Sequence, residues 1–466
     1  MSDALSAADR SALSAERGAV NMAIAGVLVA EAGPGLTYQA LCRRIAHRIH
    51  NMPRYRQRIA QPGLGLATPV WVDDENFDVE WHVRLAHLPA PGGYDELADY
   101  VAREAARVMD RARPLWELHL VEGLAGGRVA VIPKMHHALV DGLAAIGIGM
   151  ILVDPSPDAA DESGPAPEWE PEPYDPLRHL ASQATRPLGR GLRLAVDSAE
   201  RLLDTSPRSL ARDMRRATSL VTDLAVSRPD PPRLPLNRPI TANRRFAMTS
   251  VPLDGVKAAG KAAGATVNDV ILAGVTGMLD GWLREAGVKP RSLRRDPVAL
   301  VPVSMRDTGD DATGNRFSIV FVDLPVREPD PRRRIELVHE RMEAIKGSTK
   351  VRAGALLLGL AGFTPPLLSS ALARAGGGAS GFNLVVSNVP GPQFPLYLSG
   401  SRILEVYPAV PLNPADQGLN VGAFSYDGRI CFGLMADRAL DPPVNVARVA
   451  LEQAMAELTG EAPPAG

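Results

Sequence analysis

The chain has 466 residues, more than one ordinary core accommodates, and its length therefore predicts two domains. With 45% hydrophobic and 22% charged residues, the composition excludes wholesale disorder. A formal net charge of −2 argues against a general nucleic-acid binder, which needs a dominant basic surface. Cys42 and Cys431 match no metal or redox spacing, so buried or unpaired thiols and no disulfide are expected. Residues 1–18 lack the apolar core of a secretory signal, and a cytoplasmic location is expected.

The first section of the chain alternates between strand and helix patterns. In the segment VEWHVRLAH, every second residue from Val79 to Leu85 would lie on one face of a strand. In TYQALCRRIAHRIH, the apolar residues from Tyr38 to Ile49 fall on one helical face. The expected elements are a strand at 22–29, a helix at 37–50, a strand at 79–87, a helix at 94–110, and strands at 115–123 and 128–137.

An acidic, proline-rich segment follows at 154–176, which we interpret as a solvated linker. Residues 177–226 then form an expected helical region rich in arginine up to Arg216. That region is either an ordinary solvated helix face or a basic surface for anionic lipid head groups or an acyl-CoA phosphate. A later uncharged stretch, 353–373, is long enough to cross a bilayer. The double proline in its middle favours two short helices, in a core, a substrate channel or a membrane interface.

A second α/β section begins near residue 245. The segment 255–262, GVKAAGKA, imitates a phosphate loop but has Ala262 where such a loop has Ser or Thr, and it also suits an amphipathic helix. We therefore predict domains at 1–153 and 241–466, joined by a connector at 154–240. The elements expected in the second section are strands at 246–253, 297–304, 317–325, 383–390 and 418–437, and helices at 266–287 and 331–346.

The segment KMHHALVDGLAA, residues 134–145, contains the candidate catalytic residues. His136 and His137 end a strand, where neighbouring side chains point to opposite faces, so one is expected to be packed and the other presented. A presented neutral imidazole can remove a proton from a hydroxyl near neutral pH. Asp141 would open the next helix and rigidify the loop, and Gly142 would permit close backbone approach.

Spacing alone leaves other readings of the two histidines open. A buried core histidine beside a helix cap is as compatible with the spacing as a catalytic base. A zinc site is disfavoured, because no cysteine or third histidine is close in sequence. The chain also lacks the G-x-S-x-G turn of serine hydrolases.

HHALVDG matches the HHxxxDG signature of coenzyme A-dependent acyltransferases with the chloramphenicol-acetyltransferase-like fold, and the chain most resembles the bacterial wax ester synthase/diacylglycerol acyltransferase family. Supporting segments follow in the family's order: RPLWELHLVEGL, TVNDVILA, LVPVSMRD, TGNRFSIVFVDLP, SNVPGP and SYDGRICFGLMAD. The resemblance implies two similar α/β domains with mixed sheets flanked by helices and an active-site channel at their interface. It also implies that His137 is the general base, beside His136, and that Asp141 is structural.

Further candidate residues come from the same segments. We hypothesise that Arg306 pairs with Asp141 across the domain seam, because a bidentate contact would fix the histidine loop. Three other groups have both a functional and a structural interpretation. They are Asn268 and Asp269 (motif residues or a helix cap), Ser387 and Asn388 (substrate donors or a turn), and Pro114, Leu115 and Trp116 (motif residues or packing).

The resemblance implies an acyl-CoA-dependent O-acyltransferase that acts on diacylglycerol, with wax ester formation from a long-chain alcohol as a second activity. Acyl-CoA is the expected co-substrate, and no bound cofactor, metal or nucleic acid is expected. Both substrates are apolar, so a peripheral position at the inner membrane face or on lipid droplets is expected. The alternatives are a condensation-type acyltransferase that uses carrier-protein thioesters, or a catalytically silent lipid-binding protein.

Overall fold

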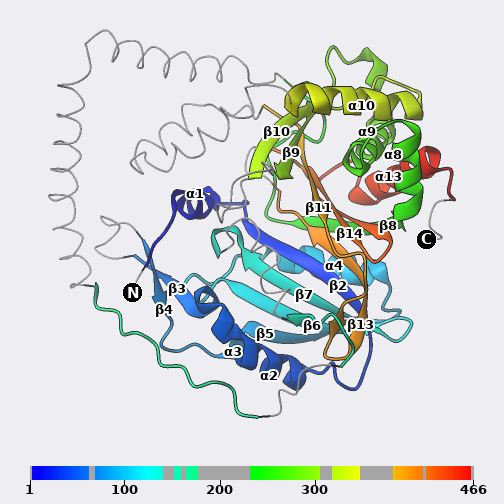
Figure 1. Cartoon of the computed structure of the whole chain (residues 1–466). Helices are drawn as coiled ribbons and strands as arrows, with labels where there is room; N and C mark the ends of the chain where they lie inside the picture. Colours follow the sequence, from blue (N-terminus) through cyan, green and yellow to red (C-terminus); the bar gives the residue numbers. More distant parts are fainter. Residues whose placement is uncertain are drawn as a thin grey trace, which may run out of the picture.

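The computed structural model describes residues 3–61, 69–139, 152–158, 164–176, 231–304, 317–346, 381–412 and 416–462. These residues build two six-stranded mixed sheets, each covered by helices, and a small three-stranded sheet near the N-terminus (Figure 1). This arrangement confirms the α/β class with mixed sheets that the sequence predicts.

The first large sheet belongs mainly to the N-terminal half. Its central strand β7 lies between β2 and β6, and its pairs are antiparallel except for β5 with β6. In order, its strands are β12 (Tyr397–Leu398), β13 (Ser401–Ala409), β2 (Ala23–Glu31), β7 (Arg128–His136), β6 (Trp116–Leu124) and β5 (Val83–His87).

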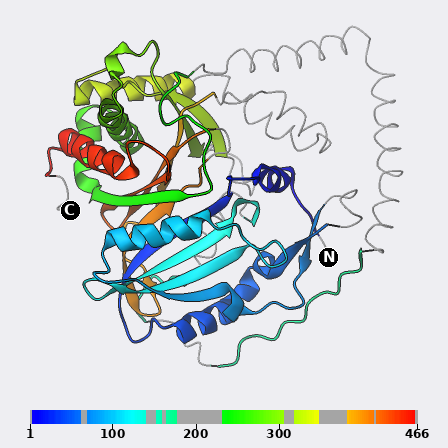
Figure 2. The ribbon, with the colours of Figure 1, turned by 180° about the vertical axis from the view of Figure 1, so that it is seen from behind.

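Helices and a small sheet complete this half. The helix α4 lies across one face of the sheet and reaches β8 of the other half (Figure 2). The helices are α1 (Ala7–Ala15), α2 (Tyr38–Arg48), α3 (Val79–His82) and α4 (Tyr94–Ala106), with short 3-10 turns η1 (Ile49–Asn51), η2 (Pro53–Arg56) and η4 (His137–Leu139). The small sheet has the order β1 (Asp3–Ala4), β4 (Val70–Asp73) and β3 (Gln57–Ala60).

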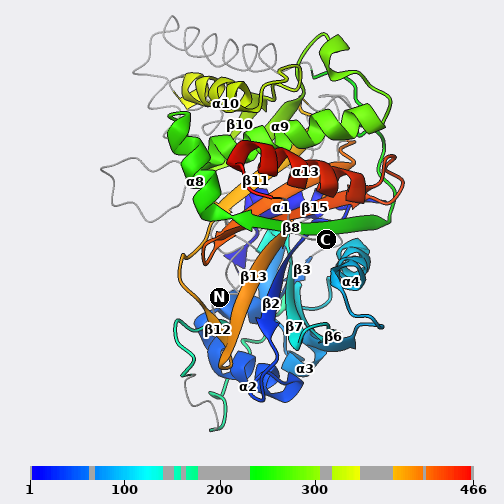
Figure 3. The same ribbon diagram turned by 90° about the vertical axis from the view of Figure 1, so that its right-hand side faces the viewer.

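The second large sheet belongs to the C-terminal half, and the helices α8, α9, α10 and α13 of the described residues cover one of its faces (Figure 3). Its strands are, in order, β10 (Phe317–Asp323), β9 (Val298–Ser304), β11 (Leu384–Pro390), β14 (Leu419–Tyr426), β15 (Arg429–Asp437) and β8 (Arg244–Pro252). The helices are α8 (Leu253–Ala262), α9 (Val267–Glu285), α10 (Pro331–Lys346) and α13 (Val444–Thr459), with a 3-10 turn η6 (Pro290–Ser292). The segment that imitates a phosphate loop lies in α8, whose Val256 is fully buried, which confirms the amphipathic helix.

A strand from the C-terminal half completes the N-terminal sheet. β13 pairs antiparallel with β2, with Val406 opposite Leu28 and Ile403 opposite Ala30. The sequence analysis missed this strand. A tyrosine fastens it, since the Tyr426 hydroxyl donates to the Ile403 carbonyl at 3.0 Å and accepts the Leu396 N–H at 2.7 Å.

The crossing of β13 over β15 requires a glycine. A Cβ atom on Gly433 would lie 1.9 Å from the carbonyl oxygen of Pro408, a distance that no real side chain tolerates. The two strands therefore approach at this point with no side chain between their backbones. The C-terminal half thus supplies β13 to the sheet of the N-terminal half, although the predicted domain boundaries place β13 in the second domain.

The strand predicted at 79–87 is wrong in its first half. Residues 79–82 form the helical turn α3, because the Asp78 carboxylate accepts the Glu80 N–H and caps it. The strand begins only at Val83, and two residues of its predicted apolar face differ in burial, since Val83 is 3% exposed and Leu85 is 55% exposed. β5 is the edge strand, so an apolar side chain there need not meet a core.

The linker predicted to be solvated lies partly against the N-terminal half. Trp169 meets Phe77 edge-on at 6.2 Å between ring centroids, and the Arg56 guanidinium lies 4.3 Å above the Trp169 ring. The Asp73 carboxylate accepts the Glu172 N–H at 3.0 Å. Aromatic and cation–π contacts thus hold residues 164–176 as a strap despite their acidic composition.

Both cysteines are free and buried, as predicted. No single helix among the described residues is long and apolar enough to span a membrane, and only the bent pair α8 and α9 satisfies the length and composition together. The basic region at 177–226 and the double-proline stretch at 353–373 lie outside the described residues.

Candidate active site

Strand β7 delivers the two histidines. The hairpin of β6 and β7 turns through Gly126 and Gly127, both with positive φ, and β7 then runs through the middle of the sheet to His136. The His136 N–H donates to the Leu115 carbonyl at 3.0 Å, and the His137 N–H donates to the Met22 carbonyl at 2.9 Å. Backbone bonds to the two neighbouring chain segments therefore fix where both side chains begin.

The two histidines differ in environment, as the strand geometry predicts. His136 is fully buried, whereas the side chain of His137, the first residue of η4, is exposed. Desolvation by the surrounding protein lowers the pKa of His137, and the His136 ring lowers it further, while its own backbone and Asp9 act in the opposite sense. The His137 ring is thus accessible to solvent although protein atoms surround it closely. Because its pKa is lowered, the ring is neutral near pH 7.

A buried carboxylate that the sequence analysis missed lies beside the motif. Glu16 Oε1 is 3.6 Å from Nε2 of His136, and Glu16 Oε2 accepts from Arg111 at 2.8 Å. Burial alone would raise the pKa of Glu16, but His136, Arg111 and the N–H of Met22 lower it to about 2. Glu16 is therefore ionised at neutral pH and ion-paired with Arg111.

The helix α1 brings this carboxylate to the site. α1 begins with a capping box in which Ser6 and Asp9 exchange side-chain and backbone bonds, and Glu16 follows its last residue. The helix contacts η4, and Figure 1 shows it at the end of β7. Only a contact across the fold reveals this role, because nothing near Glu16 in sequence resembles a site.

A second buried ionic group lies further along the same face of the sheet. The Lys134 ammonium is 3.6 Å from Glu117, which also lies 3.4 Å from the His119 ring and accepts from Arg84 at 3.2 Å. Glu117, His119 and Glu104 bring ligand atoms within 4.8 Å of one another, the spacing of a metal group among the described residues. Because Lys134 already supplies a positive charge there, we interpret the group as an ion-pair cluster.

The residues at the start of β6 brace the motif. Pro114, Leu115 and Trp116 are buried, and the Leu115 carbonyl accepts the His136 N–H. The Trp116 ring stacks on His82 with centroids 4.3 Å apart, and its Nε1–H donates to the Tyr55 carbonyl at 2.7 Å. These contacts agree with the packing interpretation of this segment, and a motif role for it stays a prediction.

Two candidate residues of the C-terminal half, Asn268 in α9 and Asn388 in β11, are in contact. The Asn388 amide donates to the Asn268 side chain at 3.2 Å, and Ser387 is half-buried beside Asn388 in β11. Asp269 has a structural position, because it forms a capping box with Thr266 and also contacts His339 at 2.8 Å. A role of these residues in substrate binding stays a prediction.

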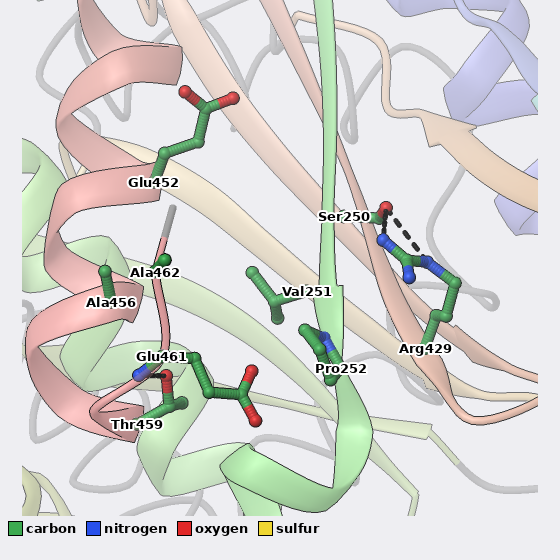
Figure 4. Close-up of a pocket in the computed structure, with 9 residues that line it drawn as sticks. All are labelled: Ser250, Val251, Pro252, Arg429, Glu452, Ala456, Thr459, Glu461 and Ala462. Atoms are coloured by element: carbon green, nitrogen blue, oxygen red, sulfur yellow. Dashed lines mark hydrogen bonds between the residues drawn. The ribbon is translucent and has the colours of Figure 1, made fainter. Parts of the chain in front are cut away.

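Three predicted residues, Asp141, Gly142 and Arg306, lie outside the described residues, and the hypothesised Arg306–Asp141 pair stays a prediction. Figure 4 shows a pocket between α13 and β8 that contains none of the predicted site residues. In it, the Arg429 guanidinium donates to the Ser250 hydroxyl at 2.6 Å.

Comparisons with known proteins agree over nearly the whole chain. The family model of the wax ester synthase/diacylglycerol acyltransferase catalytic domain matches residues 5–271, and that of the WS/DGAT C-terminal domain matches residues 313–459. The probable diacylglycerol O-acyltransferase tgs1 of Mycobacterium tuberculosis is 32% identical, covering 94% of this chain and 91% of the relative. The probable diacylglycerol O-acyltransferase tgs2 of the same species is 33% identical, covering 92% and 91%.

Solved structures show the same relationship. The wax ester synthase/diacylglycerol acyltransferase from Marinobacter aquaeolei VT8 is similar with a TM-score of 0.69 and 29% identity, covering 98% of this chain and 100% of that one. The starter condensation domain of rhizomide synthetase shares the fold at a TM-score of 0.57 and 16% identity, covering 99% and 95%. The chain therefore belongs to the wax ester synthase/diacylglycerol acyltransferase family.

Proposed function

We propose that the protein is an acyl-CoA-dependent diacylglycerol O-acyltransferase that makes triacylglycerol, with wax ester formation from a long-chain alcohol as a second activity. The observation that carries this proposal is the exposed His137 with a lowered pKa at the end of β7. The mycobacterial relatives named diacylglycerol O-acyltransferase support the acceptor, and the Marinobacter structure supports the second activity.

The neutral His137 ring acts as the general base. It takes the proton of the acceptor hydroxyl as that oxygen attacks the thioester carbonyl of acyl-CoA. The tetrahedral intermediate then collapses, the carbon–sulfur bond breaks, and the imidazolium returns the proton to the departing CoA thiolate. An ester and free CoA are the products, and this acid–base route needs acyl-CoA only as co-substrate.

The test is release of free CoA from palmitoyl-CoA, with diacylglycerol and hexadecanol supplied as separate acceptors. We expect acceptor-dependent release from the wild type and a loss of roughly 10²–10⁴-fold in His137→Ala. His50→Ala is the matched control, because His50 is also an exposed histidine but lies outside the motif. Since the pKa of His137 is lowered, the acid limb of kcat against pH should lie below the ordinary histidine value.

Other outcomes identify the alternatives. Transfer only from an acyl-carrier-protein thioester would replace the proposal with a condensation-type enzyme. Binding of acyl-CoA without turnover, in a folded protein, would indicate a silent lipid-binding protein. Equal rates in wild type and His137→Ala would overturn the assignment of the base.

We also propose that the enzyme works at an anionic membrane face or lipid-droplet surface of the cytoplasm, since its substrates are apolar. The arginine-rich region 177–226 and the apolar stretch 353–373 are the candidate contacts. Vesicle co-sedimentation tests this with phosphatidylglycerol and phosphatidylcholine vesicles. A variant lacking 177–226 that binds anionic vesicles as well as the full chain would refute the arginine-rich contact.

A further inference from the structure

The buried histidine of the motif has a defined protonation pattern. The Ala138 N–H donates to Nδ1 of His136 at 3.0 Å. A ring nitrogen can accept that bond only with a free lone pair, so Nδ1 carries no proton. The ring proton of His136 is therefore on Nε2, and the bond from Ala138 ties the ring to the η4 turn.

Among the residues that the structure describes, Glu16 is the charged group beside that proton. Nε2 of His136 is 3.6 Å from Glu16 Oε1, slightly longer than a hydrogen bond, and neither side chain is more than 3% exposed. Within the described part of the chain, Nε2 has no hydrogen-bond partner. In such a buried place a carboxylate strongly favours a proton on the nitrogen that faces it. Contacts of this kind are often long in unliganded sites and shorten when substrate binds.

Glu16 is itself held in place. Arg111 donates to its Oε2 at 2.8 Å, and the Met22 N–H donates to its Oε1 at 3.3 Å. Met22 also accepts the His137 N–H through its carbonyl. The carboxylate is thus connected to both histidines, through a side chain in one case and the backbone in the other.

We propose that Glu16 is a positioning residue for the proposed acyl transfer, which holds the ring proton of His136 on Nε2 so that Nδ1 accepts the Ala138 N–H and fixes the turn presenting His137. Glu16 contacts no substrate in this scheme. Without its charge, the Nδ1–H tautomer becomes accessible to His136. Two donors would then face each other at Ala138, the turn would move, and the base would lose its alignment.

The proposal rests on the proposed function, and its test is the Glu16→Gln variant. The neutral amide offers a donor as readily as an acceptor, so the preference for one tautomer is weakened. A misplacement of about 1 Å can cost about 10²-fold, so we expect kcat to fall by roughly 10–100-fold. KM for palmitoyl-CoA should change by less than about 3-fold, because the loss is in alignment rather than binding.

Glu452→Gln is the matched control. Glu452 is also buried and bound to an arginine, Arg448, at 2.6 Å, but that pair lies within α13. Its kcat should equal that of the wild type. A similar loss of kcat in both variants would reduce the effect to lost stability and overturn the positioning role.

A spectroscopic readout separates this proposal from the function it rests on. In ¹⁵N-histidine NMR, the His136 signals, assigned by their loss in His136→Asn, should show a single Nε2–H tautomer in the wild type. They should show a tautomer mixture in Glu16→Gln. An unchanged tautomer together with kcat within 2-fold of the wild type would overturn the proposal. A wild type without any transfer activity would refute the proposed function, while the NMR comparison would still decide the role of Glu16.

Arg111→Met is a second variant in case Glu16→Gln does not fold. The Arg111 side chain is 45% exposed, so its replacement should be tolerated. Removing the arginine leaves the carboxylate in place but releases it, and we expect a smaller fall in kcat with the same direction of change in the His136 signals. Unchanged His136 signals together with an unchanged kcat would refute the role of Arg111 in holding Glu16.

Discussion

The buried Glu117 should make the stability of the protein depend on pH. Burial alone would raise its pKa, but His119, Lys134 and Arg84 more than offset this and hold it at about 2, against 4.5 for the free side chain. A carboxyl with a lowered folded pKa contributes stability above its unfolded pKa, and the contribution is lost as pH falls through the folded value. At about 1.4 kcal/mol per pKa unit, Glu117 contributes ~3 kcal/mol above pH 6.

The variant Glu117→Gln removes this contribution. We expect its free energy of unfolding to be lower than that of the wild type by ~3 kcal/mol at pH 7, and the difference to shrink to ~1.5 kcal/mol at pH 3. Urea unfolding followed by tryptophan fluorescence measures it, since Trp116 begins the same strand, β6. Burial lowers the pKa of Lys134, and Glu117 is the largest of the groups that oppose this shift, so loss of the carboxylate also weakens the stabilisation of the ammonium. A difference that is equal at pH 7 and pH 3 would refute the ion-pair interpretation.

Three further predictions concern the attachment of β13, its crossing with β15, and the thiol of Cys431. Tyr426→Phe removes a hydroxyl that bonds the backbone of Leu396 and of Ile403 in β13, and urea unfolding should show a free energy of unfolding lower by ~1–3 kcal/mol. A decrease below about 0.5 kcal/mol would contradict this. Gly433→Ala places a methyl group against the Pro408 carbonyl and should lower Tm sharply, whereas Gly428→Ala, where the space is open, tests the effect of positive φ alone. Burial raises the pKa of Cys431 to about 12, so a thiol reagent at pH 8 should modify it only in the denatured protein, and rapid reaction of the native chain would contradict its burial.

Local patterns in the sequence predicted much of the site. The β6 and β7 strands follow from their apolar runs and the glycine turn between them, and strand alternation predicted that one histidine would be packed and the other presented. The place of Asp269 in the first turn of α9 likewise agrees with the helix-cap interpretation of that segment. These features depend on residues that are close in sequence.

Contacts between distant segments were not predictable in the same way. Glu16 meets His136 only because α1 folds back onto η4, and no residue near Glu16 signals this contact. β13 was missed because its partner β2 lies at the other end of the chain and because Pro408 interrupts a strand pattern. The segment 79–82 was misassigned because a capping carboxylate prevailed over an alternating pattern.

The pairing of β13 with β2 also constrains how the protein is made. Ile403 pairs with Ala30, so on the ribosome the β2 edge is completed only after most of the chain has been synthesised. At 5–20 residues per second, that delay is roughly 20–75 s. An unpaired strand edge can join another chain during that time, which exposes the nascent protein to aggregation. Slower growth at low temperature or a chaperone that covers the edge should therefore raise the soluble yield, and a fragment ending at residue 240 should aggregate.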